Sequence, residues 1–145
     1  RSVVMNRTRF FAIEEALKPY KKHPEDAGWD LRAAASAEVE PWKTVAIDTG
    51  VSVMIPVGHV GICKARSGFG LKGLNVTAGV IDAGYRGRIH VVVQNLSDES
   101  IVIEKHERFA QILILPCLLS ADFEIGEAPK DTERSASGFG STGVK

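Results

Sequence analysis

The C-terminal segment combines flexible residues with two side chains that are able to bind a nucleotide. It has the sequence Arg134-Ser-Ala-Ser-Gly-Phe-Gly-Ser-Thr-Gly-Val-Lys145. Its Gly and Ser residues cannot build a core. Arg134, however, carries a guanidinium that pairs with phosphate oxygens, and Phe139 carries a ring that stacks on a base. Glycines such as Gly140 let backbone N–H groups approach an anion. The segment is therefore interpreted either as a disordered terminus or as a lid over a nucleotide.

Two other short segments place polar side chains next to glycine. In Ala65-Arg-Ser-Gly68, one cation, one hydroxyl and free backbone N–H groups suit a small phosphate site, although an exposed turn has the same composition. In Val80-Ile-Asp-Ala-Gly-Tyr-Arg-Gly87, Asp82 follows an apolar run. Asp82 could orient a water for attack or cap a turn through its own backbone. Tyr85 could pack under a sugar ring or fill the turn.

A further carboxylate, Asp30, lies in Asp26-Ala-Gly-Trp-Asp-Leu31 beside an apolar pair. Like Asp82 it could orient a water, and it also suits the turn that enters a strand. Two segments match G-x-G-x-x-G, at 68–73 and 138–143. Neither fits a dinucleotide-binding fingerprint, which needs a strand before it and a helix after it. Both remain candidates for anion-binding loops.

Composition excludes several functional classes. The 145 residues include 18 Lys and Arg and 18 Asp and Glu, for a net charge of zero. A bulk nucleic-acid binder would usually be basic, so direct nucleic-acid binding is not expected, whereas a small anion held by a few local cations is allowed. No apolar run approaches the roughly 18 residues of a membrane span, and no secretory signal is visible. We expect a cytoplasmic protein, or a nuclear or host-cell one if the source is a virus, that is not secreted.

The cysteines and histidines do not have the spacing of a metal site. Cys63 and Cys117 are far apart and form no C-x-x-C pair, and the four His residues lack zinc-ligand spacing. We therefore expect two reduced, buried thiols and no zinc.

Short runs rich in Val and Ile predict a chain made mostly of β-strands. The predicted strands cover 49–55, 58–64, 88–94, 100–103 and 109–115, with turns at 56–58, 82–84 and 97–99. Many short strands at close spacing favour a sandwich, barrel or jelly roll. Good helix formers predict one short helix over 12–17, ahead of Pro19. We expect one β domain over 1–128, with 1–4 foreign to the natural chain, and a C-terminal arm over 129–145.

Taken in order, these segments resemble the trimeric dUTPase family, whose members carry five short motifs in a fixed sequence. The counterparts here, within about 25–143, are Ala27-Gly-Trp-Asp-Leu31, Ala65-Arg-Ser-Gly68, Ala78-Gly-Val-Ile-Asp-Ala-Gly-Tyr-Arg-Gly87, Glu107-Arg-Phe-Ala-Gln111 and Arg134 to Gly143. The resemblance implies an all-β, jelly-roll-like subunit in a homotrimer with shared active sites. It also implies Mg²⁺-dependent hydrolysis of dUTP to dUMP and pyrophosphate, with each arm closing a neighbour's site.

The resemblance also implies a role for each matched residue. Asp82 would be the general base, Tyr85 would pack on the deoxyribose, and a hairpin from Asn75 to Val80 would bind uracil through its backbone. Arg66, Ser67 and Gln111 would hold phosphates and the attacking water, and Asp30 would act through Mg²⁺-bound waters. In the arm, Arg134, Ser141 and Thr142 would contact the distal phosphates and Phe139 would cover the uracil. The catalytic set is Asp82, Ser67 and Gln111, and the substrate-binding set is Arg66, Ser67, Gly68, Asn75, Thr77, Gly79, Val80, Asp82, Tyr85, Gln111, Arg134, Phe139, Gly140, Ser141 and Thr142.

The sequence departs from the family pattern at a few positions. Ala65 stands where proline is usual, Glu107 where aspartate is frequent, and Ser135-Ala136 where glycine and serine are common. Trp29 is bulkier than the residue expected in the first motif, and its simplest role is core packing.

Two alternatives to dUTP hydrolysis follow from the same fold. The related dCTP deaminases carry a catalytic Glu on the strand after the third motif, at the position of Val92. Valine cannot transfer protons, which argues against deamination. The second alternative is a dUTPase-fold protein that regulates protein partners, either instead of catalysis or in addition to it. The sequence does not indicate a protein inhibitor.

Overall fold

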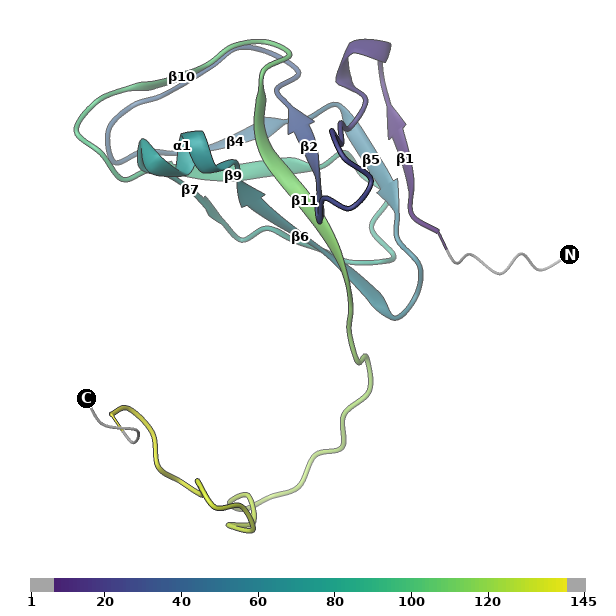
Figure 1. Ribbon diagram of the computed structural model, residues 1–145, viewed down its shortest axis with the longest axis vertical. Helices are drawn as coiled ribbons and strands as arrows, with labels where there is room; N and C mark the ends of the chain where they lie inside the picture. Colours follow the sequence, from purple (N-terminus) through teal and green to yellow (C-terminus); the bar gives the residue numbers. More distant parts are fainter. Residues whose placement is uncertain (1–6, 141–145) are drawn as a thin grey trace, which may run out of the picture.

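The computed structural model describes residues 7–140, and almost every regular element in that range is a β-strand (Figure 1). The two helical elements are a 3-10 turn, η1 (Glu15–Leu17), and a short helix, α1 (Ser67–Leu71). The predicted all-β class is therefore confirmed. The strands are β1 (Arg9–Ala12), β2 (Gly28–Arg32), β3 (Ala37–Val39), β4 (Thr44–Asp48), β5 (Val51–Met54), β6 (His59–Ala65), β7 (Leu74–Thr77), β8 (Val80–Ile81), β9 (His90–Asn95), β10 (Ile101–Ile103) and β11 (Arg108–Pro116).

The strands form antiparallel sheets of a jelly-roll-like sandwich. The larger sheets have the orders β2–β11–β6–β8 and β4–β9–β7, and the pairs β1–β5 and β10–β3 complete the body. The long strand β11 lies between β2 and β6, and its register sets Gln111 opposite Asp30 on one side and Lys64 on the other. This register brings the first, second and fourth sequence motifs to the same end of one sheet.

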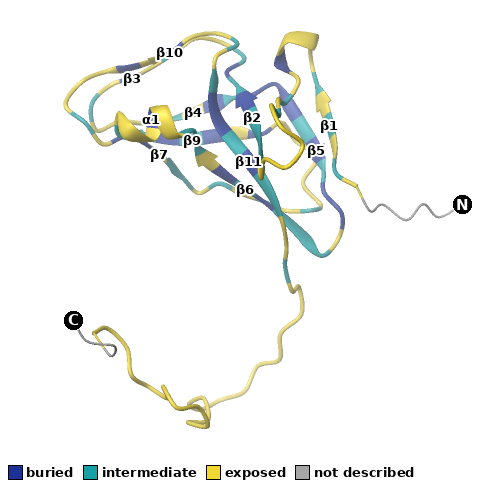
Figure 2. Ribbon diagram, viewed as in Figure 1, coloured by how far each residue is buried: buried dark blue, intermediate teal, exposed yellow. Residues whose placement is uncertain are grey.

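Alternating apolar residues form the core. On β9 the side chains of Val91 and Val93 are buried, and Ile101 and Ile103 are buried on β10, as expected for strands with one face inward. Figure 2 shows the buried positions along the facing strands of the body. The buried polar side chain of Asn95 donates hydrogen bonds to the carbonyls of Val39 and Glu99, so its amide is satisfied.

Three local predictions differ from the structure. The short helix predicted over 12–17 is confined to the 3-10 helix η1 over 15–17, because β1 pairs with β5 up to Ala12. The glycine-rich segment from Gly68 is not a loop, because its first residues form α1. The segment from Asn75 to Val80 is not a paired hairpin, since β7 bonds to β9 and β8 bonds to β6. In the first and third cases, pairing with distant strands overrode a local pattern.

Beyond β11 the chain leaves the body. Every residue from Leu118 to Gly140 is exposed (Figures 1 and 2). The division of the chain after residue 128 stays a prediction. Within residues 7–140, no helix combines the length and apolar character needed to cross a membrane.

Candidate functional site

A pocket of about 470 Å³ lies where the loop before β2, the β6–α1 corner and β11 meet. Four residues predicted from three separate motifs line it: Asp30, Arg66, Ser67 and Gln111. The complete lining is Tyr20, Lys21, Lys22, Asp26, Ala27, Gly28, Asp30, Arg66, Ser67, Arg108 and Gln111. The fold therefore brings these motif residues together although they are far apart in the sequence.

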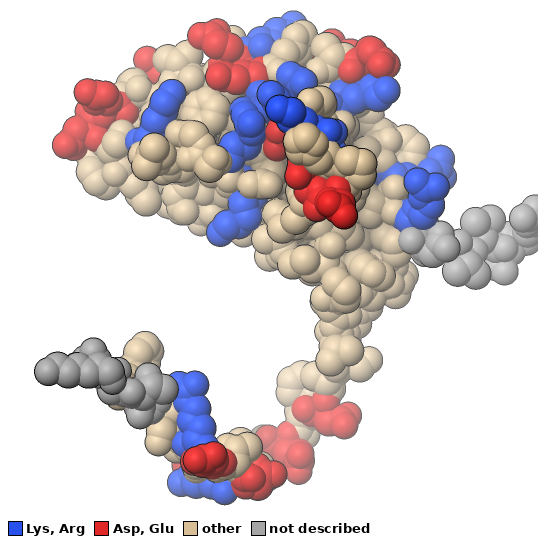
Figure 3. All heavy atoms as spheres, in the orientation of Figure 1, with Lys and Arg blue, Asp and Glu red and all other residues tan. Residues whose placement is uncertain are grey.

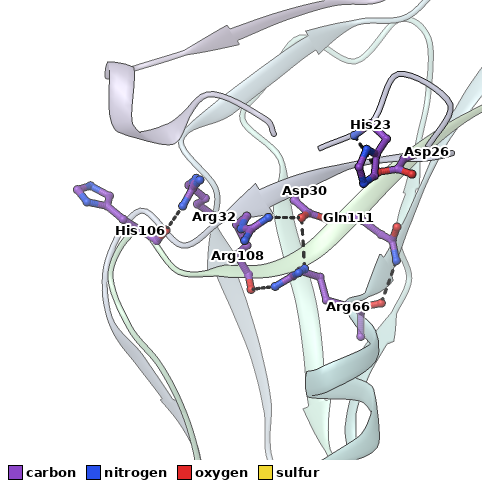
Figure 4. A network of polar contacts seen from close by, with 9 residues as sticks. His23, Asp26, Asp30, Arg32, Arg66, His106, Arg108 and Gln111 are labelled. Atoms are coloured by element: carbon purple, nitrogen blue, oxygen red, sulfur yellow. Dashed lines mark hydrogen bonds and ion pairs between the residues drawn. The ribbon is translucent and has the colours of Figure 1, made fainter. Parts of the chain in front are cut away.

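Asp30 is the centre of the polar network in this pocket (Figure 4). Its Oδ2 atom lies 3.3 Å from Nε of Arg66 and accepts a hydrogen bond from Nη1 of Arg108 at 3.1 Å. Arg66 also donates from Nη1 to the carbonyl of Arg108 at 3.3 Å. The Asp30 carboxylate, whose side chain is 19% exposed, thus holds two guanidinium groups at the pocket wall.

Gln111 is fixed from two directions. Its Nε2 donates to the carbonyl of Ala65 at 3.3 Å, which ties β11 to the residue before the Arg66–Ser67 corner. On the opposite side it packs against Gly28, where an added Cβ atom would lie only 2.5 Å from Oε1 of Gln111. The absence of a side chain at Gly28 leaves the amide of Gln111 room to face the pocket.

Positive charge predominates in the pocket. The lining contains the cations Lys21, Lys22, Arg66 and Arg108 against the carboxylates Asp26 and Asp30. Figure 3 shows Lys and Arg side chains gathered on the face that carries β2 and β11, with acidic side chains beside them. Such a surface favours a small polyanion, because several cations and N–H donors converge on one cavity.

A second group of predicted residues lies on the turn after β8. The backbone N–H of Tyr85 donates to the carbonyl of Asp82 at 3.1 Å, which confirms the predicted turn. The Tyr85 hydroxyl donates to the carbonyl of Arg88 at 2.9 Å, and the ring lies against Gly87, where a Cβ atom would lie 2.4 Å from the hydroxyl oxygen. Asp82 itself is exposed.

The two groups lie at opposite ends of β6. Ile81 pairs with Gly61, near the start of that strand, whereas Arg66 follows its end. At about 3.3 Å per residue, Asp82 and Arg66 are roughly 16 to 20 Å apart within one chain. The two groups are therefore well separated within one chain.

A third group of predicted residues, Asn75, Thr77, Gly79 and Val80, borders the β7–β8 connection. Ala78 and Gly79 both have positive φ, at 59° and 82°, and the carbonyl of Gly79 accepts a hydrogen bond from the N–H of Cys63 at 2.8 Å. Asn75 on β7 donates from Nδ2 to Oε1 of Gln94, and Thr77 and Val80 flank the turn. Burial raises the pKa of the Cys63 thiol to about 11, so this residue is a structural thiol rather than a nucleophile.

Among the residues that the structure describes, none of the C-terminal segment lines the pocket of its own chain. Arg134 donates from Nε to the carbonyl of Ser137 at 2.9 Å in a local turn, and the side chain of Phe139 is fully exposed. Gly140 has a positive φ of 76°. The predicted residues Ser141 and Thr142 lie outside the described residues.

Comparison with known proteins identifies the family. The family model described as dUTPase matches residues 14–143. The chain belongs to the dUTPase family. The deoxyuridine 5'-triphosphate nucleotidohydrolase of Corynebacterium diphtheriae is 45% identical over 130 residues, which cover 87% of this chain and 85% of the relative. The enzyme of the same name from Paramecium bursaria Chlorella virus 1 is 35% identical over 133 residues, covering 91% and 94%.

Solved dUTPases share the fold over nearly the whole chain. The dUTPase of Staphylococcus bacteriophage 80alpha, in a structure with dUpNHpp, has a TM-score of 0.86 and 31% identity over 97% of this chain and 100% of the phage chain. A variant dUTPase of phage phi11, with a TM-score of 0.75 and 27% identity over 84% and 98% of the two chains, is described with a structural Mg(II) ion.

Sequence reasoning missed part of this dUTPase pocket. Arg108 lay inside the fourth motif without a role, and Tyr20, Lys21 and Lys22 precede the first motif. Arg108 could have been predicted, because it lies in the same matched motif as Gln111. For Tyr20 and the two lysines only the structure shows that the loop before β2 folds back over Asp30.

Proposed function

We propose that this protein hydrolyses dUTP to dUMP and pyrophosphate in the pocket around Asp30, Arg66, Ser67 and Gln111. The observation that carries the proposal is that three family motifs converge there on one cavity with excess positive charge. Phosphoryl transfer needs positioning and charge neutralisation more than covalent chemistry, and this pocket provides both.

The reaction divides between the two groups of residues. Asp82, on an exposed turn, takes a proton from water as the water oxygen bonds to the α-phosphorus. The bond from that phosphorus to the bridging oxygen breaks, and pyrophosphate leaves with the electron pair. Arg66 and Ser67 bind the phosphates, and Gln111 orients the water or a phosphate oxygen from the position that Ala65 and Gly28 fix. The arm residues Arg134 and Phe139 cover the substrate and exclude water.

The residues present fit Mg²⁺ brought in by the substrate. Among the residues that the structure describes, no three His, Cys, Asp or Glu side chains converge to hold a metal, and Mg²⁺ favours substrate phosphates and waters over a protein cage. Both contacts of Asp30 with arginine use Oδ2, so its Oδ1 atom is suited to accept a hydrogen bond from a metal-bound water. When bound, the ion supplies charge neutralisation for the triphosphate.

The separation of Asp82 from Arg66 supports a shared site in a homotrimer. Because the two residues lie toward opposite ends of β6, the proposal places Asp82 of one subunit with the phosphate pocket of another. Head-to-tail contacts around a threefold axis create three such sites.

Specificity for deoxyuridine resides on the Asp82 side of the site. The Tyr85 hydroxyl donates one hydrogen bond to the carbonyl of Arg88, and the ring lies against Gly87. In the proposed complex this ring packs on the deoxyribose where a 2′-hydroxyl would clash. The tight turn at Ala78 and Gly79 presents backbone groups to uracil, and Asn75 and Thr77 precede that turn.

A pyrophosphate-release assay with dUTP tests the activity and the role of Asp82 together. The Asp82→Asn variant keeps the size of the side chain but cannot take a proton, so turnover should fall roughly 10²-fold or more while dUpNHpp binding stays within a few-fold. Asp98→Asn, at another exposed turn, is the matched control and should retain turnover. Near-normal turnover of Asp82→Asn would remove Asp82 from this role, and an inactive wild-type protein would refute the proposed function.

A further inference from the structure

The loop from Tyr20 to Asp26, which none of the five motifs includes, is fixed at the rim of the phosphate pocket. At its start, Tyr20 and Asp30 exchange two backbone hydrogen bonds of 3.0 and 2.7 Å, so the chain pairs directly with the central residue of β2. The Tyr20 ring also lies 4.5 Å from the guanidinium carbon of Arg108. The beginning of the loop is therefore part of the Asp30 network.

The far end of the loop is closed by a second set of hydrogen bonds. The N–H of His23 donates to Oδ2 of Asp26 at 3.1 Å, and the N–H of Asp26 donates to the carbonyl of His23 at 3.0 Å. Figure 4 shows this turn beside Asp30 and Gln111. Pro19 precedes the segment 20–23 and Pro24 follows it, and each proline restricts the backbone at its end of that segment. Lys22 lies between two fixed points, so little backbone freedom remains to be lost when it binds an anion.

Lys21 has a structural partner within this loop, which distinguishes it from Lys22. The ammonium of Lys21 lies 3.7 Å from the centroid of the Trp29 ring, and that ring also contacts Phe10. A cation over an aromatic face at this distance is stabilised by the ring quadrupole. Trp29, which departs from the family pattern, thus anchors the loop. Within residues 7–140, Lys22 makes no ion pair or cation–π contact.

We propose that Lys22 binds the distal phosphates of the substrate. The inference rests on the proposed function of the pocket, and it assigns this role to a residue outside the family motifs. Arg66 and Arg108 share Asp30 as a counter-ion, whereas Lys22 lines the same pocket without a carboxylate partner in the described chain. A lysine ammonium is a compact charge that suits a terminal phosphate.

The test compares charge removal at Lys22 with charge removal at a lysine outside the pocket. The variants are Lys22→Gln, Lys22→Arg and, as the matched control, Lys18→Gln, because Lys18 is 65% exposed and pairs with Glu15. Binding of dUpNHpp with Mg²⁺ and of dUMP is measured by titration calorimetry, and KM and kcat are measured with dUTP.

We expect Lys22→Gln to weaken dUpNHpp binding and raise KM roughly three- to tenfold, the scale of one partly screened charged contact. Binding of dUMP, which lacks the distal phosphates, and kcat should stay within about twofold, and both Lys22→Arg and Lys18→Gln should resemble the wild type. Equal effects at Lys22 and Lys18, or equal losses for dUpNHpp and dUMP, would overturn the role. A wild-type protein that neither binds dUpNHpp nor hydrolyses dUTP would refute the proposed function itself.

Discussion

At the scale of single residues, the site depends on how Asp30 arranges two guanidinium groups. Arg66 and Arg108 both contact the same carboxylate oxygen, yet each guanidinium carries five N–H donors. Most of these donors therefore remain able to bind phosphate. The ion pairs limit the rotamers of both arginines before the substrate arrives, which lowers the entropic cost of binding.

The residues that could be predicted are those whose types and order form motifs. Asp30, Arg66, Ser67 and Gln111 were predicted in this way and lie in one pocket. Lys22 could not be predicted, because a pair of lysines near proline is indistinguishable in sequence from a solvated surface. What gives Lys22 its place is the backbone pairing of Tyr20 with Asp30, a tertiary contact without a local sequence signal.

Cys63 leads to a prediction about alkaline stability. Burial raises its pKa from 9.0 to about 11, so the thiol stays neutral in the folded protein at pH values where the unfolded chain already ionises. The contribution to stability is complete below pH 9.0 and is lost as the pH rises toward 11. We expect the free energy of unfolding to fall by about 2 kcal/mol across this window.

Urea denaturation at a fixed protein concentration, on both sides of this pH window, measures the loss. Cys63→Ala removes the thiol and should show a correspondingly smaller dependence on pH, although its stability at neutral pH is lower because of the cavity. Parallel pH profiles for the wild type and the variant would contradict the prediction. The difference between the two proteins isolates the thiol from lysines and tyrosines, which titrate in the same range.

At the scale of secondary structure, the register of β11 decides the site. Its pairing with β2 sets Gln111 opposite Asp30, and its pairing with β6 sets the same residue opposite Lys64, next to Ala65. The sequence predicted this strand over 109–115 from its own apolar residues, but it did not predict the two strands that pair with it. A run of apolar residues indicates a strand without saying which strand it pairs with, so the contact of three motifs could be expected only from the family resemblance.

The contact between β2 and β11 yields a prediction at Gly28. A methyl group there would lie 2.5 Å from Oε1 of Gln111, so Gly28→Ala should displace the amide rather than the sheet. Because misplacement of a positioning group by about 1 Å can cost up to roughly 10²-fold in rate, we expect kcat to fall roughly 10- to 100-fold. The melting temperature should change little.

Gly70→Ala is the control for Gly28→Ala, since nothing lies within 4 Å of a Cβ atom at Gly70 and alanine favours the helix α1. Its kcat should match that of the wild type. Thermal unfolding and pyrophosphate release are measured for both variants. An unchanged kcat for Gly28→Ala would show that Gln111 has no positional role, whereas a large fall in melting temperature would place the effect in the fold.

At the scale of the whole molecule, the predicted site residues of one chain fall into separate groups. Asp82 and Tyr85 lie at the start of β6, the phosphate pocket lies at its end, and the segment after β11 extends away from both (Figure 1). The jelly-roll fold explains this division, because its long strands separate the loops at the two ends of a sheet. The proposed homotrimer agrees with this arrangement, because neighbouring copies would bring the two groups together.

The shared site predicts that two inactive proteins restore activity to each other. Asp82→Asn lacks the base, and Arg66→Gln lacks the guanidinium beside Asp30, so each homotrimer should be inactive. When equal amounts are unfolded, mixed and refolded, about three quarters of the trimers contain both variants. If Asp82 and Arg66 of each site come from different subunits, each mixed trimer has one site with both residues intact. Roughly a quarter of all sites should then recover in the pyrophosphate-release assay.

If one subunit supplied both residues, no mixed trimer would contain an intact site. Mixed trimers whose composition is confirmed by mass but which remain inactive would therefore reject the shared-site arrangement.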